Sequence, residues 1–310
     1  MLEATLSTRR LGCEFEFTMP VVGAGSGRDV QAVLAQVLTA NGLNSIARSY
    51  SHEPLPSGVD LAVETDSSVH GMDDLQGLQW AAIEMKTRIL NGMEDFEHVV
   101  PQALDIARYL GGRVNGSTGF HVHVDFPEAR LSPAKIRSLY NIVARVEPIL
   151  FALVPPSRKT CGFCQPMPHA PRLLHGCRGI RSFRNRLANW NRYYGLNLQP
   201  LWGPEPNVEF RHGAATLNPE KARHWVRLLT RIVDHAVVRN CQTAEKPMEC
   251  TRKGFEAMRY TLGLRSNQGI YVRTEFRDTS SYLLRRWKHF NEPQSTSGND
   301  HKNRDVAEVE

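Results

Sequence analysis

The stretch Phe120 to Phe126, FHVHVDF, alternates large apolar residues with two histidines and an aspartate. Successive side chains of a β-strand point to opposite faces, so His121, His123 and Asp125 would share one face and the apolar residues the other. A short run with this alternation predicts a half-buried strand rather than a helix. Taken alone, the polar face is most simply a solvated sheet surface.

Four other short segments have the same period of two, and their polar faces carry carboxylates and cations. Two neighbouring carboxylates on one face repel each other unless a cation compensates them. Together with FHVHVDF, these segments favour a charged site over a simply solvated face. The polar-face residues are Glu14 and Glu16 in CEFEF, Glu64, Asp66 and Ser68 in VETDSS, Glu84, Lys86 and Arg88 in IEMKTR, and Glu209 and Arg211 in VEFRH.

The residue types on these faces indicate the kind of ligand. Carboxylates dominate, with one or two imidazoles and no cysteine, which is a donor set suited to Mg²⁺ or Mn²⁺. Arginine and lysine on the same surface imply an anionic substrate, most simply a phosphate. Metal, phosphate and cationic side chains together indicate phosphoryl transfer from a nucleotide. Because the chain has no Gly-x-x-x-x-Gly-Lys-Ser/Thr motif, we predict a nucleotide site on the sheet face rather than a P-loop.

Caps, apolar spacing and helix breakers predict the order of the elements. Runs of consecutive strands between helices favour an α+β fold with an antiparallel or mixed sheet. Residues 155–206 are rich in Pro, Gly and Arg and are predicted to be an irregular, lid-like excursion within a single domain over residues 1–290. The polar residues 291–310 are predicted to be a disordered tail. Four helices are expected, from Asp29 to about Gly42, Glu97 to Leu110, Ser132 to about Leu153, and from Asn218 onward.

Composition sets broad limits on the protein. Its 310 residues are 41% hydrophobic, enough for a sizeable core, and the net charge of +6 permits anionic ligands. We find no apolar signal core at the N-terminus and no run long enough to span a membrane, so we expect a cytoplasmic protein without a membrane partner. The six cysteines are then expected to be reduced thiols.

Five motifs in order resemble the amidoligase family, which is similar to glutamine synthetase and γ-glutamylcysteine ligase. They extend from about Leu11 to Val238 and read GCEFEF, AIEMKTRIL, NGSTGFHVHVDF, RYYGLNL and VEFRHGAATLNPEKARHWVRL. The resemblance implies an ATP-dependent carboxylate–amine ligase in which ATP phosphorylates a carboxylate and an amine attacks the acyl phosphate. It also implies a curved antiparallel sheet, with ATP and two or three Mg²⁺ on the concave face and helices on the convex face.

The resemblance also implies roles for individual residues. Arg211 matches the arginine that stabilises the transferred phosphoryl group, and Glu209 and Asp66 are the other catalytic candidates. Lys86, His123 and Asn197, with Arg211, are assigned to cofactor binding, and we place Asp66 and His123 near the substrate amine or carboxylate. The matched metal ligands are Glu14, Glu16, Glu84, His121 and Glu209.

Two departures from the family pattern concern the substrate contacts. The segment DLAVETDSSV lacks the tryptophan that often precedes the Asp-x-Ser element. Lys86 and Thr87 follow Met85 where the family commonly has Ser-Pro, and Lys86 adds a positive charge to the polar face. The substrate contacts are therefore expected to differ from those of other members.

Other functions stay open at this point. A metal-dependent hydrolase could use the same glutamate and histidine face without nucleotide. The arginine cluster between Arg178 and Arg192, with its aromatic neighbours, could serve a non-catalytic nucleotide- or nucleic-acid-binding protein. The CGFC segment, Cys161 to Cys164, could bind zinc, but its irregular spacing from other cysteines and histidines favours ordinary thiols. We expect small-molecule or peptide carboxylates and amines as substrates, rather than nucleic acid.

Overall fold

The computed structural model describes residues 7–21, 25–51, 53–70, 79–170, 173–266 and 272–292, which form two compact units. The N-terminal unit contains Thr8–Val122 and Gly213–Arg223. The C-terminal unit contains His123–His212 and the described residues from His224 to Glu292. Each unit combines helices with strands of a mixed, mostly antiparallel sheet, and this class of fold agrees with the prediction.

The N-terminal unit is built on a sheet with strand order β2-β3-β4-β1-β6, and β5 also pairs with β1. β1 is antiparallel to β4 and β5, β3 is antiparallel to β4, and β2 is parallel to β3. Its elements are β1 (Arg10–Pro20), α1 (Gly27–Ala40), β2 (Ser45–Ala47), β3 (Leu61–Glu64), β4 (Trp80–Thr87), β5 (Leu90–Asn91), α2 (Gly92–Tyr109) and the first part of β6 (Gly119–Asp125).

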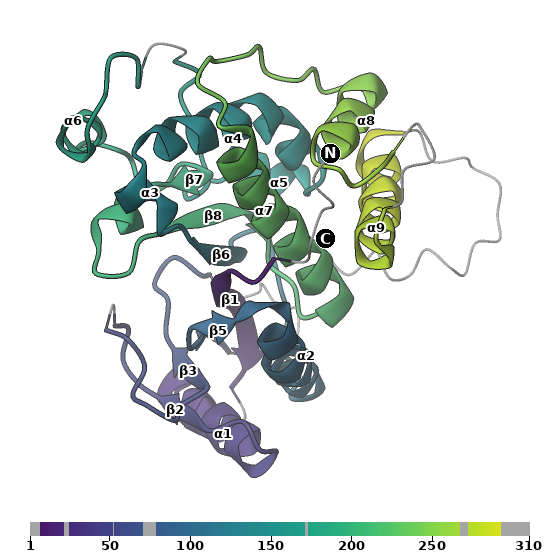
Figure 1. Cartoon of the computed structure of the whole chain (residues 1–310). Helices are drawn as coiled ribbons and strands as arrows, with labels where there is room; N and C mark the ends of the chain where they lie inside the picture. Colours follow the sequence, from purple (N-terminus) through teal and green to yellow (C-terminus); the bar gives the residue numbers. More distant parts are fainter. Residues whose placement is uncertain are drawn as a thin grey trace. The chain divides into compact units, whose positions relative to one another are not determined.

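The core of this unit lies on the apolar face of β1. Cys13, Phe15 and Phe17 alternate along the strand and are buried, as the period of two predicts. The Phe15 ring stacks on Phe120 of β6 with 4.5 Å between ring centroids. Helices α1 and α2 contact the strands of this sheet and each other (Figure 1). The polar side chains of β1 are thereby directed to the opposite face.

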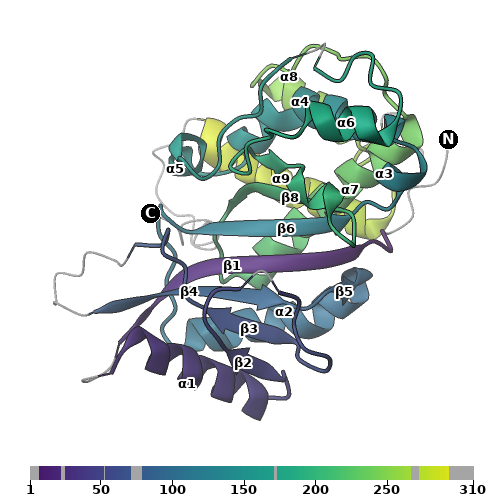
Figure 2. The same ribbon diagram turned by 90° about the vertical axis from the view of Figure 1, so that its left-hand side faces the viewer.

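The C-terminal unit is mostly helical. Helix α4 contacts α3, α5, α8 and α9, and these helices gather around it (Figure 2). β8 lies between the end of β6 and β7, and it is antiparallel to β7. The elements are α3 (Glu128–Leu131), α4 (Ala134–Ala152), α5 (Pro156–Thr160), α6 (Ile180–Arg186), β7 (Leu196–Asn197), the 3₁₀-helix η1 (Gln199–Trp202), most of β8 (Asn207–Ala214) and of α7 (Pro219–Arg239), α8 (Arg252–Thr261) and α9 (Thr274–Asn291).

Two predicted helices are confirmed as α4 and α7, and the other two begin earlier than predicted. α1 begins at Gly27 because Ser26 is its N-cap, and the Asp29 carboxylate accepts the Ser26 N–H at 2.6 Å to close a capping box. α2 begins at Gly92 and runs through Pro101 instead of starting near it.

Two further sequence-based boundaries need correction. The predicted strand VETDSS ends at Glu64, because the Asp66 side chain accepts the Ser68 N–H at 2.6 Å and forms a turn. Asp66 and Ser68 therefore do not share a strand face with Glu64. The segment 155–206, predicted to be irregular, contains α5, α6, β7 and η1, which are too short to show periodicity in the sequence.

Some predictions fall at the limits of the described chain. Of the predicted tail, only Asn291, the last residue of α9, and Glu292 are described; the rest lies outside the described residues. Among the described helices, none is both long and apolar enough to cross a bilayer. The six cysteines are free thiols.

His235 of α7 gives the C-terminal unit a pH-dependent stability. Burial, followed by the charges of Arg231, Arg239 and Arg145, lowers its pKa from 6.5 to about 4. The unfolded chain therefore takes up this proton first, and the folded protein should lose stability as the pH falls from about 6.5 to about 4. Between these two pH values, the unfolding free energy of His235→Gln should fall by about 1–2 kcal/mol less than that of the unsubstituted protein.

Urea unfolding at several pH values measures this effect. His169→Gln, which changes an exposed histidine of the same unit, is the matched control and should follow the unsubstituted protein. The same pH dependence in all three proteins would contradict the role of His235.

Candidate metal-binding and catalytic residues

Three carboxylates form one row across β1, β4 and β3 in the N-terminal unit. The strand register places Glu16 opposite Glu84, and Glu84 opposite Glu64. All three side chains are buried. Like charges directly opposite each other on neighbouring strands are unfavourable, and buried charges need partners. This carboxylate row (Glu16, Glu84 and Glu64) therefore requires positive charge beside it.

His121 of β6 faces one end of the carboxylate row. Its Nδ1 lies 3.2 Å from Oε2 of Glu14, and its Nε2 lies 3.4 Å from Oε1 of Glu16. A neutral imidazole has one N–H and cannot donate to both carboxylates. The Gly119 N–H donates to Oε2 of Glu16 at 2.6 Å and fixes that carboxylate. Ligand atoms of Glu16, Glu84 and His121 all lie within 4.8 Å of one another, a spacing that suits the ligands of one ion.

The electrostatics of Glu84 fit a cation at this position. Burial, and then repulsion from Glu14, raise the pKa of Glu84 from 4.5 to about 9, even though the Lys86 charge works in the opposite direction. Bound metals require deprotonated carboxylates and favour that form by their charge. Oxygen donors with one imidazole are a set that Mg²⁺ or Mn²⁺ accepts. The residues present therefore fit the predicted metal.

Lys86 and Glu64 occupy the other end of the row. The Lys86 ammonium lies 2.9 Å from Oε2 of Glu84 and 2.9 Å from Oε2 of Glu64. The Nε of Arg48 donates to Oε1 of Glu64 at 2.6 Å, and the Ser51 N–H donates to Oε2 at 3.2 Å. The sequence placed Glu64 on a polar face without assigning it a role. Its importance follows from the strand register, which a single strand does not reveal.

Asp66 was predicted to be catalytic from a strand position that it does not have. It is half-buried in the turn after β3. Its charge contributes to the raised pKa of Glu84, so the two carboxylates are within electrostatic reach of each other. A role for Asp66 in catalysis stays a prediction.

The C-terminal unit brings three other predicted residues together. Nη1 of Arg211 donates to Oε1 of Glu209 on the same strand, and Nε of Arg211 donates to the Phe163 carbonyl at 3.0 Å. Asn197 of β7 lies opposite Glu209 in the register, and its Nδ2 donates to Oε2 of Glu209 at 2.7 Å. All three predicted side chains are buried, so β7 and β8 hold the Arg211 guanidinium in a fixed orientation.

Contacts from the 155–206 segment also hold Arg211, and the sequence analysis missed them. The buried Arg158 of α5 donates through Nη2 and Nε to the Arg211 carbonyl, at 2.7 and 3.1 Å. The Gly195 carbonyl accepts the Arg211 N–H at 2.8 Å. No periodic signal marks Arg158, because α5 has only five residues.

The residue after Arg211 is fixed as well. His212 is fully buried, and its Nε2 lies 3.0 Å from Oε1 of Glu147 in α4. Glu147 also accepts the Met167 N–H at 3.0 Å. The Phe151 ring packs against the imidazole with 5.1 Å between centroids. Glu147 and Phe151 of α4 therefore hold β8 in place at His212.

His123 and the cysteines were the remaining candidates. Nδ1 of His123 lies 2.9 Å from Oδ1 of Asn207, within the C-terminal unit. Cys161 and Cys164 belong to none of the groups of three potential ligands found among the described residues, and burial raises the pKa of Cys164 to about 11. The interpretation of this pair as ordinary thiols stays a prediction.

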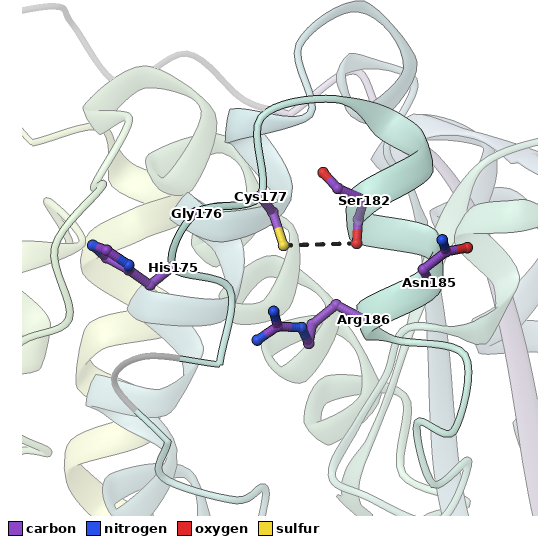
Figure 3. Close-up of a pocket in the computed structure, with 6 residues that line it drawn as sticks. All are labelled: His175, Gly176, Cys177, Ser182, Asn185 and Arg186. Carbon is purple, nitrogen blue, oxygen red and sulfur yellow. Dashed lines mark hydrogen bonds between the residues drawn. The ribbon is translucent and has the colours of Figure 1, made fainter.

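A cavity of about 440 Å³ lies in the C-terminal unit at the start of α6 (Figure 3). Inside it the Cys177 thiol donates to the Ser182 carbonyl at 3.6 Å. None of the residues assigned to metal, cofactor or catalysis lines this cavity. Its lining residues are His175, Gly176, Cys177, Ser182, Asn185 and Arg186.

Comparisons with known proteins place the chain in a family. A profile of the family described as "Putative amidoligase enzyme" matches residues 7–233, so the chain belongs to the amidoligase family, as its motifs indicated. No curated protein matches the chain. Among solved structures, it is similar to the complex between the prokaryotic ubiquitin-like protein Pup and its ligase PafA, with 13% identity and a TM-score of 0.41. That match covers 91% of this chain and 63% of the other, and a similarity of this size does not define an activity.

Proposed function

We propose that the protein is an ATP- and Mg²⁺-dependent carboxylate–amine ligase, which forms an amide, peptide or isopeptide bond through an acyl phosphate. The observation that carries the proposal is the buried set of Glu16, Glu84 and His121 in a member of the amidoligase family. These residues, with Glu14 beside them, would hold Mg²⁺. The metal would neutralise charge on the ATP phosphates and on the attacking carboxylate.

The proposed reaction has two steps. An oxygen of the substrate carboxylate attacks the γ-phosphorus of ATP, and ADP leaves. The amine then attacks the acyl carbon, phosphate leaves, and the amine loses a proton. We assign Arg211 to stabilising the charge on the transferred phosphoryl group, with Glu209 and Asn197 orienting its guanidinium. Asp66 and His123 are assigned to the substrate amine or carboxylate.

The proposal extends to the surface that binds ATP. We assign the polar face of the sheet, where Lys86 adds positive charge, to the nucleotide. The family resemblance implies that this face is concave. Substrates are proposed to be small-molecule or peptide carboxylates and amines.

Trapping the acyl phosphate with hydroxylamine tests the function without knowledge of the natural amine. A panel of amino-acid and peptide carboxylates is incubated with ATP, Mg²⁺ and hydroxylamine. For an accepted carboxylate, ADP, phosphate and hydroxamate should form in equal amounts, and none should form without Mg²⁺. Cleavage of an ester or amide without ATP would favour the metal-dependent hydrolase instead.

Removing one metal-binding carboxylate should abolish this reaction. We expect Glu16→Gln to lower the rate of ADP formation by about 10²–10³-fold or more, because the neutral amide is a poorer ligand for a hard cation. Glu97→Gln makes the same chemical change at a surface ion pair with Arg223 and should leave the rate unchanged. Full turnover in Glu16→Gln would refute the assignment.

A further inference from the structure

The Lys86 ammonium lies between two buried carboxylates, Glu84 and Glu64, which would otherwise need another cation. In the carboxylate row, the gap between Glu16 and Glu84 faces His121, whereas the gap between Glu84 and Glu64 holds the Lys86 ammonium at 2.9 Å from an oxygen of each. On the sheet, Lys86 is opposite Glu14 of β1 and Ala62 of β3. The Lys86 backbone is therefore two residues along β4 from the carboxylate row, and its side chain extends back to bridge Glu84 and Glu64.

The ammonium is held in this position. Its Nζ lies 4.1 Å from the centroid of the Tyr50 ring, a cation–π contact. The two ion pairs and this ring contact together fix the ammonium between Glu84 and Glu64.

The summed formal charge of the carboxylates and their paired cations can be compared with the charge of the ion that they would bind. With all carboxylates deprotonated, Glu14, Glu16, Glu64 and Glu84 contribute four negative charges. Lys86 and Arg48, both in ion pairs with this set, contribute two positive charges. The remaining charge of minus two is that of one divalent cation. A second divalent ion is excluded by position rather than by total charge, because the Lys86 ammonium already lies between Glu84 and Glu64, 2.9 Å from an oxygen of each.

We infer that Lys86 takes the place of a second divalent cation, so that this face binds a single divalent ion in the absence of nucleotide. That ion would lie between Glu16, Glu84 and His121. Removal of the ammonium should open a second site between Glu84 and Glu64. The inference rests on the metal role proposed above for Glu16, Glu84 and His121, but not on the ligase reaction itself.

Manganese titration of the full chain without nucleotide tests the inference. Mn²⁺ is paramagnetic, so the free ion can be counted by electron paramagnetic resonance and the stoichiometry checked by calorimetry. We expect the unsubstituted protein to bind one Mn²⁺ and Lys86→Gln to bind two. Lys86→Arg, which keeps the charge, should bind one. The double variant Lys86→Gln, Glu64→Gln should return to one, because the second site has lost a carboxylate.

Arg48→Gln separates the filled gap from the total charge. Arg48 is the other cation that pairs with Glu64, through Oε1, whereas Lys86 pairs with Oε2. The Arg48→Gln variant therefore loses one positive charge but keeps Lys86 between Glu84 and Glu64. We expect it to bind one Mn²⁺. If Lys86→Gln and Arg48→Gln bound the same number of ions, the inference would be overturned.

The count on the unsubstituted chain needs no variant to fold, and two bound ions there would also overturn the inference. Binding of one ion by both the unsubstituted protein and a folded Lys86→Gln would refute the role of Lys86 but would leave the proposed metal ligands standing. Failure of the unsubstituted protein to bind any ion would instead refute the metal set on which the proposed function depends.

Discussion

Arg211→Lys should lower carboxylate-dependent ADP formation by about 10³-fold, the smaller end of the range for arginines that stabilise a transferred phosphoryl group. The buried guanidinium is planar and donates from Nε to the Phe163 carbonyl at 3.0 Å while Nη1 binds Glu209. A lysine ammonium is a single point of charge on a flexible stem and cannot satisfy both partners in a fixed plane. Charge is retained in this variant, so the loss measures orientation rather than net charge.

The matched control is Arg286→Lys. Arg286 is also buried and in the same unit, and its Nε donates to the Leu153 carbonyl at 2.8 Å. Both lysine variants should unfold at lower urea concentration than the unsubstituted protein, because each leaves a buried carbonyl with a poorer donor. Only Arg211→Lys should lose turnover per folded molecule. Equal turnover in the two variants would argue against a catalytic role for Arg211.

The sequence could predict which residues share a strand face because apolar and polar residues alternate along the strands. On β1 and β4 the period of two places Glu16 and Glu84 on the face opposite to Phe17 and Ile83, and the structure buries both pairs. His121 follows the same rule on β6. Alternation does not say which strands are neighbours or in which register. That is why the pairing of Glu84 with Glu64, and hence the position of Lys86 between them, could be seen only in the structure.

The missed contacts share a different physical cause. Arg158 reaches the Arg211 carbonyl over a separation of 53 residues, and Glu147 reaches His212 over 65. Such long-range pairs leave no periodic trace in the sequence. The Asp66 position was mispredicted for a local reason, because a short polar side chain can bond its own backbone and end a strand.

Gly195→Ala should be the most damaging single-methyl change near Arg211. A Cβ atom at Gly195 would lie 2.7 Å from Cδ2 and Cε1 of His212, and closer still to Nε2. The imidazole has little room to move, since Glu147 binds its Nε2 and the Phe151 ring packs against it. Overpacking of this kind typically costs about 1–3 kcal/mol, and we expect the upper end here.

Gly162→Ala is the matched control for this substitution. It lies in the same 155–206 segment, and a Cβ atom there would meet nothing within 4 Å. Urea unfolding should show a lower midpoint for Gly195→Ala and an unchanged one for Gly162→Ala. Because the Gly195 carbonyl accepts the Arg211 N–H, any shift of the Gly195 backbone also moves the guanidinium. Gly195→Ala should therefore lose turnover per folded molecule as well as stability, whereas a purely structural role for Gly195 would leave the turnover of the folded fraction intact.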